Sequence, residues 1–350
     1  QANSTHSGKG FTGNGVKVNA VNRAYNQFIV DQLRQAQSHA GSVNAYYGEL
    51  SKIDNLFSNK ESSLSSQIND LFSNLNKLSS NAADPAGRQT VMSSLESLVS
   101  QFNKTEINLK NQINNVNNEL AKNVGKINSY TQQIAELNQK IARLQNVSGG
   151  HEPNDLLDQR DQLVSELNEI IGVNVTEQNG QYNLSLMNGL NLVQGSNANL
   201  LSVQPSSADP SLFSIIYTHN SGATQELTSQ NINSGSLHGL LTFRDGPLNE
   251  SRNQLGLIAL NLADRFNEVN CSGVDIHGNP GEKLFDFAKP TTIANNKNQG
   301  QATIDAVYNK VTDVKASDYE ITFIGGEWVV TRLSDNQQIT TETKDGQLIF

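Results

Sequence analysis

The sequence has few of the residues on which many enzymes and disulfide-stabilised domains depend. It contains one cysteine, Cys271, so no disulfide bond can form within the chain. Charged residues make up 17% of the 350 residues, well below the roughly 25% usual for soluble domains. The formal net charge of −9 argues against a nucleic-acid backbone or an anionic membrane as a partner. No apolar run approaches the ~20 residues of a membrane-spanning helix.

Motifs for cofactor binding are equally scarce. Gly8, Gly10 and Gly13 match the spacing of a dinucleotide-binding turn, but almost no chain precedes them and Asn14-Gly15 follows. Because that motif needs a preceding strand and a helix that opens at its last glycine, we expect a flexible loop here. No histidine or cysteine pair has the spacing of a zinc site, and no Gly-x-Ser-x-Gly motif is present.

Two acidic stretches are candidate sites. Asp275, Asn279 and Asp286 have part of a calcium-loop pattern, but Pro280 stands at the sixth position, where that loop needs glycine. We therefore predict a solvated turn. The charged residues in "DLLDQRDQL" favour a helix N-terminus, with Arg160 in a local ion pair. We predict no catalytic, cofactor-binding or metal-binding residue, and no cofactor.

Helical periodicity dominates the first half of the chain. Apolar spacing predicts helices at about 22–38, 43–78, 88–147 and 154–171, with Asp84 and Pro85 opening the third. The third helix keeps a seven-residue repeat from Met92 to Leu144 over roughly 80 Å, with polar exceptions at Glu106 and Asn123. Its predicted buried seam includes Phe102, Leu109, Ile113, Leu120, Ile127, Ile134, Leu137 and Ile141.

The period then changes to two. Alternating residues from Val173 onward, with Asn179-Gly180 and Asn188-Gly189 as turns, predict antiparallel strands. A helix returns over 245–270 with Pro247 in its first turn, and a hairpin follows across Gly325-Gly326. We expect an α+β multidomain fold: an elongated bundle of long antiparallel helices with inserted small antiparallel β domains. The predicted segments are a helical rod domain (1–172), a β domain (173–235), a returning helix (236–272) and a second, truncated β domain (273–350).

The polar faces of the helices carry Asn, Gln, Ser and Thr rather than ions. Amides cost less to desolvate than charges, so such faces suit lateral packing against neighbouring subunits. Repeated head-to-tail contacts of this kind generate tubes. The chain starts at Gln1 and stops at Phe350 inside a stretch that reads as a strand, so we expect a piece of a longer protein.

Three stretches carry a family likeness. "GNGVKVNAVNRAYNQFIVDQLRQAQ", "PNDLLDQRDQLVSELNEIIGVNV" and "LADRFNEVNCSGVDIHGNPGEKLF" resemble, in this order, the flagellar hook-associated protein 1 family. Asn270 stands where the family pattern usually has a histidine, so the chain departs from the pattern at this position. The motif residues that carry the likeness include Arg23, Tyr25, Phe28, Asp158, Arg160, Asp161, Asn267, Gly273 and Asp275.

The resemblance implies a non-enzymatic structural protein at the junction between flagellar hook and filament. It implies that the protein leaves the cell through the flagellar type III export pathway. Implied partners are the hook protein, a second hook-associated junction protein, further copies of the chain in the flagellar tube and an export chaperone that binds the missing terminal region. The isolated chain is expected to be monomeric. A secreted adhesin with a helical stalk and a β-domain tip is the alternative, and an enzyme is the least favoured.

Overall fold

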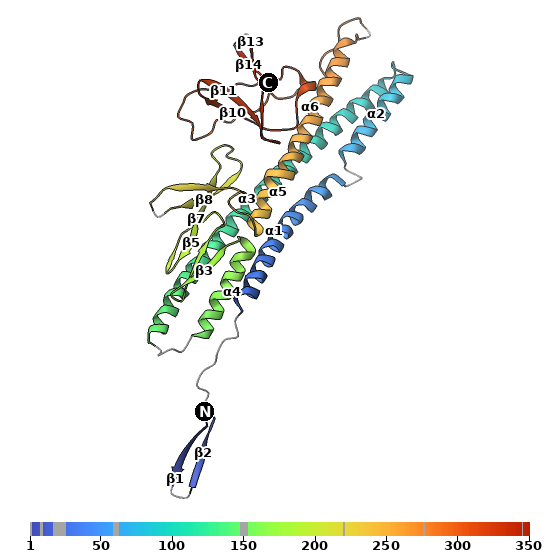
Figure 1. Ribbon diagram of the computed structural model, residues 1–350. Coiled ribbons are helices and arrows are strands. Elements are labelled where there is room, and N and C mark those ends of the chain that lie inside the picture. Colours follow the sequence, from blue (N-terminus) through green and yellow to red (C-terminus); the bar gives the residue numbers. More distant parts are fainter. Residues whose placement is uncertain are drawn as a thin grey trace. The chain divides into compact units, whose positions relative to one another are not determined.

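The computed structural model describes residues 2–7, 10–16, 26–58, 63–147, 153–219, 221–275, 277–344 and 346–350, with the backbone path alone for the first two ranges. Long α-helices combined with small antiparallel sheets make up the fold, as predicted (Figure 1). The helices are α1 (Gln27–Ser58), α2 (Leu64–Ser80), α3 (Pro85–Val147), α4 (Asn154–Ile170), α5 (Ser236–Phe243) and α6 (Asn249–Ser272).

The chain divides into two compact units. Unit 1 comprises residues 1–43, 123–202 and 216–238, and unit 2 comprises 44–122, 203–215 and 239–350. This division cuts across helices, whereas the predicted domains follow consecutive segments of the sequence. The predicted domain boundaries therefore stay a prediction.

Helix α1 is one continuous helix where we expected a break between 38 and 43. Gly41 lies inside this helix and against another backbone, because a Cβ there would lie 2.4 Å from the carbonyl oxygen of Glu169. The sequence leaves open whether the predicted second helix, 43–78, is continuous, and the structure divides it: α1 takes its first part and α2 its last part. The side chain of Ser63 caps α2 by accepting from the Ser66 amide at 3.1 Å.

The opening of α3 follows the prediction. The carboxylate of Asp84 accepts hydrogen bonds from the amides of Ala86 and Gly87, both at 3.1 Å, and Pro85 begins the helix. The helix is 63 residues long. It supplies residues to both units: its residues up to Lys122 belong to unit 2, and those from Asn123 onward belong to unit 1.

The helix predicted to begin near Asp245 begins earlier, at Ser236. Pro247 lies inside a five-residue π-helical turn, Arg244–Leu248, that joins α5 to α6, and the expected first-turn position is wrong. Proline has no N–H and clashes with the preceding turn of an α-helix. A π-turn is wider, so the helix continues past the proline instead of starting at it.

The strands form separate antiparallel sheets. One sheet has the order β3-β4-β5-β6 and a second β7-β8-β9, followed by β10-β11-β12 and the pair β13-β14. Their bounds are β3 Asn174–Gln178, β4 Gln181–Ser185, β5 Asn191–Gln194, β6 Asn197–Ala198, β7 Leu201–Pro205, β8 Phe213–Thr218, β9 Thr224–Leu227, β10 Tyr319–Ile324, β11 Glu327–Arg332, β12 Gln337–Ile339, β13 Glu342–Lys344 and β14 Gln347–Ile349.

Two predicted hairpins are confirmed. Asn179 and Gly180 join β3 to β4 with φ of 53° and 74°, and Gly325 and Gly326 join β10 to β11 with φ of 64° and 91°. Both turns need left-handed backbone, which glycine and asparagine adopt most readily. A further hairpin pairs β1 (Ala2–Ser7) with β2 (Gly10–Val16). Gly10 and Gly13 thus lie in a strand. Of the two forms that the Gly- and Asn-rich composition of residues 1–20 favours, loop or short strand, the structure has the strand here.

Candidate functional site: the α3 seam and its asparagine contacts

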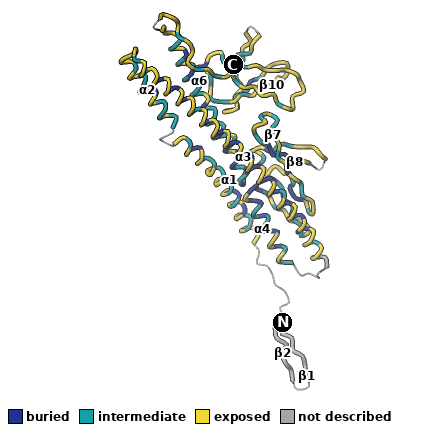
Figure 2. Tube along the Cα trace, turned by 180° about the vertical axis from the view of Figure 1, so that it is seen from behind, coloured by how far each residue is buried: buried dark blue, intermediate teal, exposed yellow. Residues whose placement is uncertain are grey.

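The predicted seam of α3 is almost wholly buried. Leu109, Leu120, Ile127, Ile134 and Ile141 are each 0% exposed. Ile113 and Leu137 are also buried, and Phe102 is half-buried. In unit 2 Phe102 packs on a cluster of α2 and α3 side chains, namely Leu71, Val91, Leu95 and Leu98. In unit 1 Leu137 and Ile141 pack on Leu157 of α4. Figure 2 shows such buried segments along the helices.

The register near the start of α3 differs from the prediction. Met92 and Val99 are 45% and 41% exposed, whereas Val91 and Leu98 are buried beside Leu95. Both phases have apolar residues at three- and four-residue spacing, so the sequence pattern fits either. Contact with α2 selects the 91, 95, 98 phase.

Asparagines on the polar face of α3 form hydrogen bonds to other parts of the same chain. Asn117, Asn128 and Asn138 lie about three helical turns apart and thus on related faces. Asn128 donates from Nδ2 to the Leu201 carbonyl at 2.8 Å and accepts from the Leu201 amide at 2.9 Å. Asn117 donates to the Ser211 carbonyl at 2.8 Å and accepts from the Phe213 amide at 3.0 Å.

The Asn138 side chain makes the most hydrogen bonds of the three. Its Nδ2 donates to the carbonyls of Tyr182 and Gly195, at 2.8 and 2.7 Å. Its Oδ1 accepts from the Tyr182 amide and from Nη1 of Arg160, both at 3.0 Å. These four bonds fill both donors and both acceptor positions of the amide, which is 0% exposed. A side-chain amide therefore bonds to a strand as a neighbouring strand would.

Arg160, one of the motif residues, lies at the centre of this contact. It is 1% exposed, and its Nη1 also donates to the Gly180 carbonyl at 2.8 Å. Its guanidinium carbon lies 3.5 Å from the centroid of the Tyr182 ring, a cation–π distance. The local ion pair that we predicted for Arg160 is not what positions it: its hydrogen bonds tie α4 to α3 and to the β3–β4 turn.

Asp161 extends the same network. Its Oδ1 accepts from Nη2 of Arg34 at 2.8 Å and from the Tyr182 hydroxyl at 2.9 Å. Arg34 belongs to the first of the three family-like stretches and is 3% exposed. The network thus joins α1, α4 and β4 within unit 1. Asp158, by contrast, lies on the exposed face of α4.

The other motif residues of the first stretch are not part of this site. Phe28 is 69% exposed on α1. Arg23 and Tyr25 lie outside the described residues. The structure therefore brings Arg160 and Asp161 together, and leaves Asp158 and Phe28 at the surface.

The third stretch forms a second asparagine contact, in unit 2. Asn267 of α6 donates to the Phe285 carbonyl at 2.8 Å and accepts from the amides of Leu284 and Phe285, at 2.8 and 2.9 Å. One turn on, Nδ2 of Asn270 donates to the Glu282 carbonyl at 2.6 Å. The asparagine at the position of the family's usual histidine therefore has a structural contact of its own. Gly273 follows as the residue that ends α6.

The predicted solvated turn at Asp275 is confirmed. Its carboxylate accepts hydrogen bonds from the His277 amide and from both nitrogens of Asn279, at 2.7 to 3.0 Å, and the residue is exposed. The Asn279 side-chain amide, followed by the backbone amides, lowers the pKa of this carboxyl. Among the described residues, no group of three or more His, Cys, Asp or Glu could hold a metal ion.

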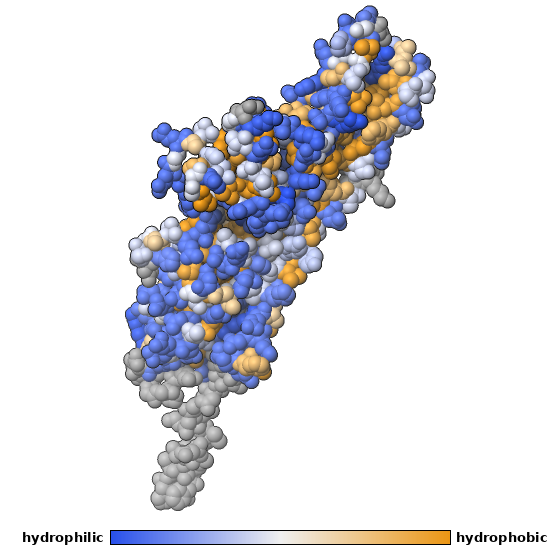
Figure 3. Space-filling view, turned by 45° about the horizontal axis from the view of Figure 1, so that its top comes forward, coloured by the Kyte–Doolittle hydropathy of each residue, from blue (hydrophilic) through white to orange (hydrophobic). Residues whose placement is uncertain are grey.

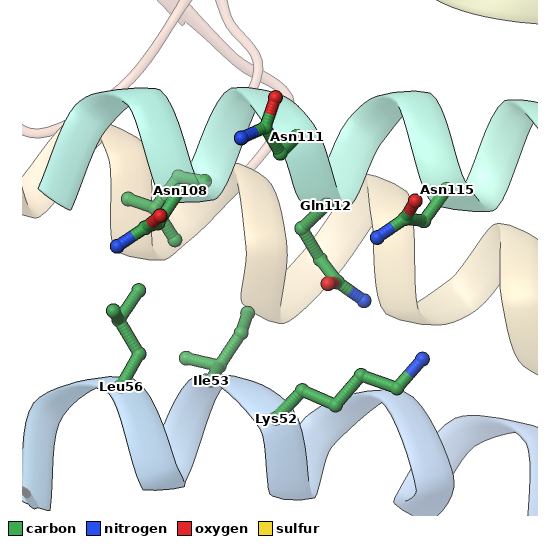
Figure 4. A pocket seen from close by; sticks show the side chains of 8 residues that line it. Lys52, Ile53, Leu56, Asn108, Asn111, Gln112 and Asn115 are labelled. Atoms are coloured by element: carbon green, nitrogen blue, oxygen red, sulfur yellow. The ribbon is translucent and has the colours of Figure 1, made fainter. Parts of the chain in front are cut away.

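One groove of unit 2 has little chemistry to offer a substrate. It lies in unit 2 between α1 and α3, with a volume of about 240 Å³ (Figure 4). Ile53 and Leu56 of α1 point toward α3, and Gln112 points back toward α1. The lining residues are Lys52, Ile53, Leu56, Asn108, Leu109, Asn111, Gln112 and Asn115, a set without an acid or an imidazole. Within the described residues, no helix has the length and hydropathy needed to cross a bilayer.

Comparisons with known proteins agree on one family. The family model described as "Flagellar hook-associated protein FlgK helical domain" matches residues 50–285. A second, "Flagellar hook-associated protein 1, D2-like domain", matches residues 293–350. The chain is 45% identical to flagellar hook-associated protein 1 of Escherichia coli K12 over 100% of its own length and 64% of that protein.

Related proteins from other bacteria give the same result. Flagellar hook-associated protein 1 of Salmonella typhimurium LT2 is also 45% identical, over 99% of this chain and 64% of its own length. The solved structure of the flagellar hook junction protein FlgK from Burkholderia pseudomallei superposes with a TM-score of 0.83 at 35% identity, covering 90% of this chain and 57% of that one. The chain thus spans less than two thirds of these relatives, and it belongs to the flagellar hook-associated protein 1 family.

Proposed function

We propose that this chain is the central part of a structural protein that forms the junction between the flagellar hook and the filament. The observation that carries the proposal is the 45% identity to flagellar hook-associated protein 1, which extends over the whole chain. The similar Burkholderia structure is described as a hook junction protein. The adhesin alternative finds no support among these relatives.

The protein acts without catalysis in this proposal. In unit 1 the buried Asn138 hydrogen-bonds to Arg160 and to backbone, and Asp161 accepts from the Tyr182 hydroxyl, which suits a structural contact better than a reactive one. The α1–α3 groove lacks an acid–base pair. The described residues offer no metal cluster either. The seam residues of α3 are therefore proposed to work as structure, by holding the helices together.

Helix α1 offers the surface through which such a protein would assemble. One stripe of α1 follows alternating steps of four and three residues, with Asp54 as its polar member. Its apolar members are Ile29, Leu33, Ala36, Ala40, Val43, Tyr47, Leu50 and Phe57. Ile29 and Tyr47 are 59% and 61% exposed, so the stripe is largely uncovered. Figure 3 shows that hydrophobic side chains also gather at the surface over other helices.

A seven-residue repeat of apolar residues is the pattern by which one helix packs along another. An exposed apolar stripe of this length marks an interaction surface. We propose that helices of the assembled junction cover the α1 stripe, so that self-association in the flagellar tube uses apolar contacts as well as amide faces. The hook protein and a second hook-associated junction protein are the proposed neighbours. The proposed location is outside the cell, reached by the flagellar export pathway with the help of a chaperone.

The test is removal and restoration of the intact gene in the source bacterium. Cells without it are expected to carry hooks that lack filaments and to release filament protein into the medium, as seen by electron microscopy and immunoblotting. The intact gene supplied in trans is expected to restore attached filaments and swimming. Normal filaments in the deletion strain would reject the junction role. Secretion of the other hook-associated proteins is the control that export still works.

A further inference from the structure

The β region at the end of unit 2, residues 293–350, has very few buried side chains. Among its described residues, 293–344 and 346–350, only Val311 and Val330 are buried. The sheet β3-β4-β5-β6 of unit 1 differs, since Tyr182 and Leu184 of β4 are 3% and 0% exposed. A small antiparallel sheet is stable when its apolar face packs against a further layer. Within the described residues, the sheet β10-β11-β12 is fully covered at Val330 alone.

This sheet has one apolar and one polar face. Directly opposed residues on neighbouring strands share a face, as do residues two apart along a strand. The apolar face carries Tyr319, Ile321, Phe323, Trp328, Val330 and Ile339, with Arg332 and Gln337 at one end. The opposite face carries Glu320, Thr322, Ile324, Glu327, Val329, Thr331 and Gln338. The first face therefore has the pattern of a face that is buried.

The apolar face is uncovered toward the β10–β11 turn. Phe323 and Trp328 are 60% and 39% exposed, whereas Val330 is 0% exposed. Their rings contact each other with centroids 4.9 Å apart. Aromatic side chains gain much from burial, and a cluster of exposed apolar side chains marks an interaction surface. This end of the sheet is therefore a surface for a further layer.

A second feature of the β region is a segment with the composition of a strand and no strand partner. Residues 302–308, "ATIDAVY", are rich in β-branched and aromatic side chains, yet they belong to no strand. Their backbone groups form no backbone–backbone hydrogen bond with any residue that the structure describes. The Ile304 carbonyl accepts from the Thr292 hydroxyl at 2.8 Å. Unpaired backbone of this kind can pair with an added strand.

The last residue of the chain lies on the same face. The ring of Phe350 contacts that of Tyr319, with centroids 5.3 Å apart (Figure 1). The chain covers 64% of the length of the Escherichia coli relative, so a further part of that protein lies outside the match. A segment that follows Phe350 would begin against the apolar face, whereas one that precedes Gln1 would begin in unit 1.

We propose that the segment following Phe350 in the full-length protein completes the β region. It packs on Phe323 and Trp328 and adds a strand along residues 302–308. This inference rests on one part of the proposed function, namely that the chain is the central part of a longer protein. It does not depend on the junction role.

Hydrogen–deuterium exchange of the purified full-length protein and of the 350-residue chain tests the inference. We expect the amides of residues 302–308 and 319–332 to exchange at least about tenfold more slowly in the full-length protein. Phe323→Ala in the full-length protein should remove the slowing at 319–332, because it takes away the covered ring. The same change in the 350-residue chain should alter exchange little. Exchange in α3 should stay the same in every variant, which shows that the helices remain folded.

Ile324→Ala is the matched control, because Ile324 is the next residue, is 64% exposed and lies on the polar face. This variant is expected to keep the slow exchange of the full-length protein. Equal exchange of either segment in the two proteins would overturn the inference, as would equal effects of the two variants. Slowing that appears in the 350-residue chain as its concentration rises would assign the surface to a second copy instead and also overturn it. Normal filaments in the deletion strain would reject the junction role and leave these exchange rates as expected.

Discussion

Asn138 of α3 and Tyr182 of β4 exchange two hydrogen bonds, from the Asn138 amide to the Tyr182 carbonyl at 2.8 Å and from the Tyr182 amide to the Asn138 side-chain oxygen at 3.0 Å. A helix side chain here does what an adjacent strand does in a sheet. Asn128 repeats the exchange with Leu201, and Asn267 of α6 repeats it with Phe285. These contacts explain why part of the polar face of the long helix carries amides: it holds strands rather than ions.

Asn138→Leu is expected to destabilise unit 1 strongly. The change leaves the backbone of Tyr182, the Gly195 carbonyl and Nη1 of Arg160 without their partner in a buried place. Leaving buried polar groups unsatisfied costs about 1–3 kcal/mol each, so we expect a loss of about 3–5 kcal/mol in the free energy of unfolding. Urea unfolding followed by circular dichroism measures it. Gln139→Leu, at the exposed neighbour, is the control and should change stability by less than about 0.5 kcal/mol.

Ile134→Asp tests the buried seam. Ile134 is 0% exposed, so the change removes apolar burial and places a carboxylate where water does not reach. We expect a loss of more than about 4 kcal/mol and a lower Tm. Gln133→Asp places the same carboxylate on the exposed face and should leave Tm nearly unchanged. An unaltered Tm for Ile134→Asp would show that the seam is not the core of the helix packing.

Gly41→Ala and Gly48→Ala should change stability in opposite directions. At Gly41 the new Cβ would lie 2.4 Å from the carbonyl oxygen of Glu169, a backbone atom that cannot rotate away. We expect a loss of about 1–3 kcal/mol. At Gly48 the Cβ meets open space, and helix propensity should give a gain of up to about 1 kcal/mol. Thermal unfolding of both variants measures the difference, and losses of equal size would contradict the close approach of α1 and α4.

Stability should fall at high pH, in part because of Tyr217. Burial raises the pKa of its phenol above the ordinary value, although the hydrogen bond with Asn199 lowers it somewhat. The folded state therefore holds this proton more tightly than the unfolded state. The resulting stability is complete below about pH 10 and is lost as the pH rises through the folded pKa. Tyr217→Phe should make the urea midpoint decline less steeply between pH 9 and 11, on the order of tenths of a molar. Since burial also raises the pKa of Tyr130 and Tyr308, some decline should remain.

Periodicity in the sequence predicted the long helices and the antiparallel hairpins because both signals are local. The repeat from Phe102 to Ile141 has one phase, and that phase is buried. Asn179-Gly180 and Gly325-Gly326 dictate their turns through positive φ. The resemblance, which rests on three ordered stretches, agrees with the family found by comparison.

The features that could not be predicted from the sequence depend on contacts between residues far apart in the chain. The helix break predicted between 38 and 43 is absent, and Gly41 is a point of close approach to α4. Met92 and Val91 fit alternative phases, and contact with α2 decides between them. The asparagine contacts could not be predicted from the sequence, because an asparagine on a helix can bond equally well to water or to the backbone of a strand. Their spacing of about three turns along α3 was the one available signal.

Filament attachment with an altered α1 stripe tests the central claim most directly. The full-length gene carrying Tyr47→Glu is supplied to cells that lack it, and filament protein shed into the medium is compared with that left on the cells. Tyr47 is 61% exposed, so the charge should not disturb the fold of the subunit itself. Asn55→Glu, on another face of α1, is the control and should support normal attachment. If α1 is covered by other helices in the junction, Tyr47→Glu will release filaments. Full attachment with Tyr47→Glu would contradict the account.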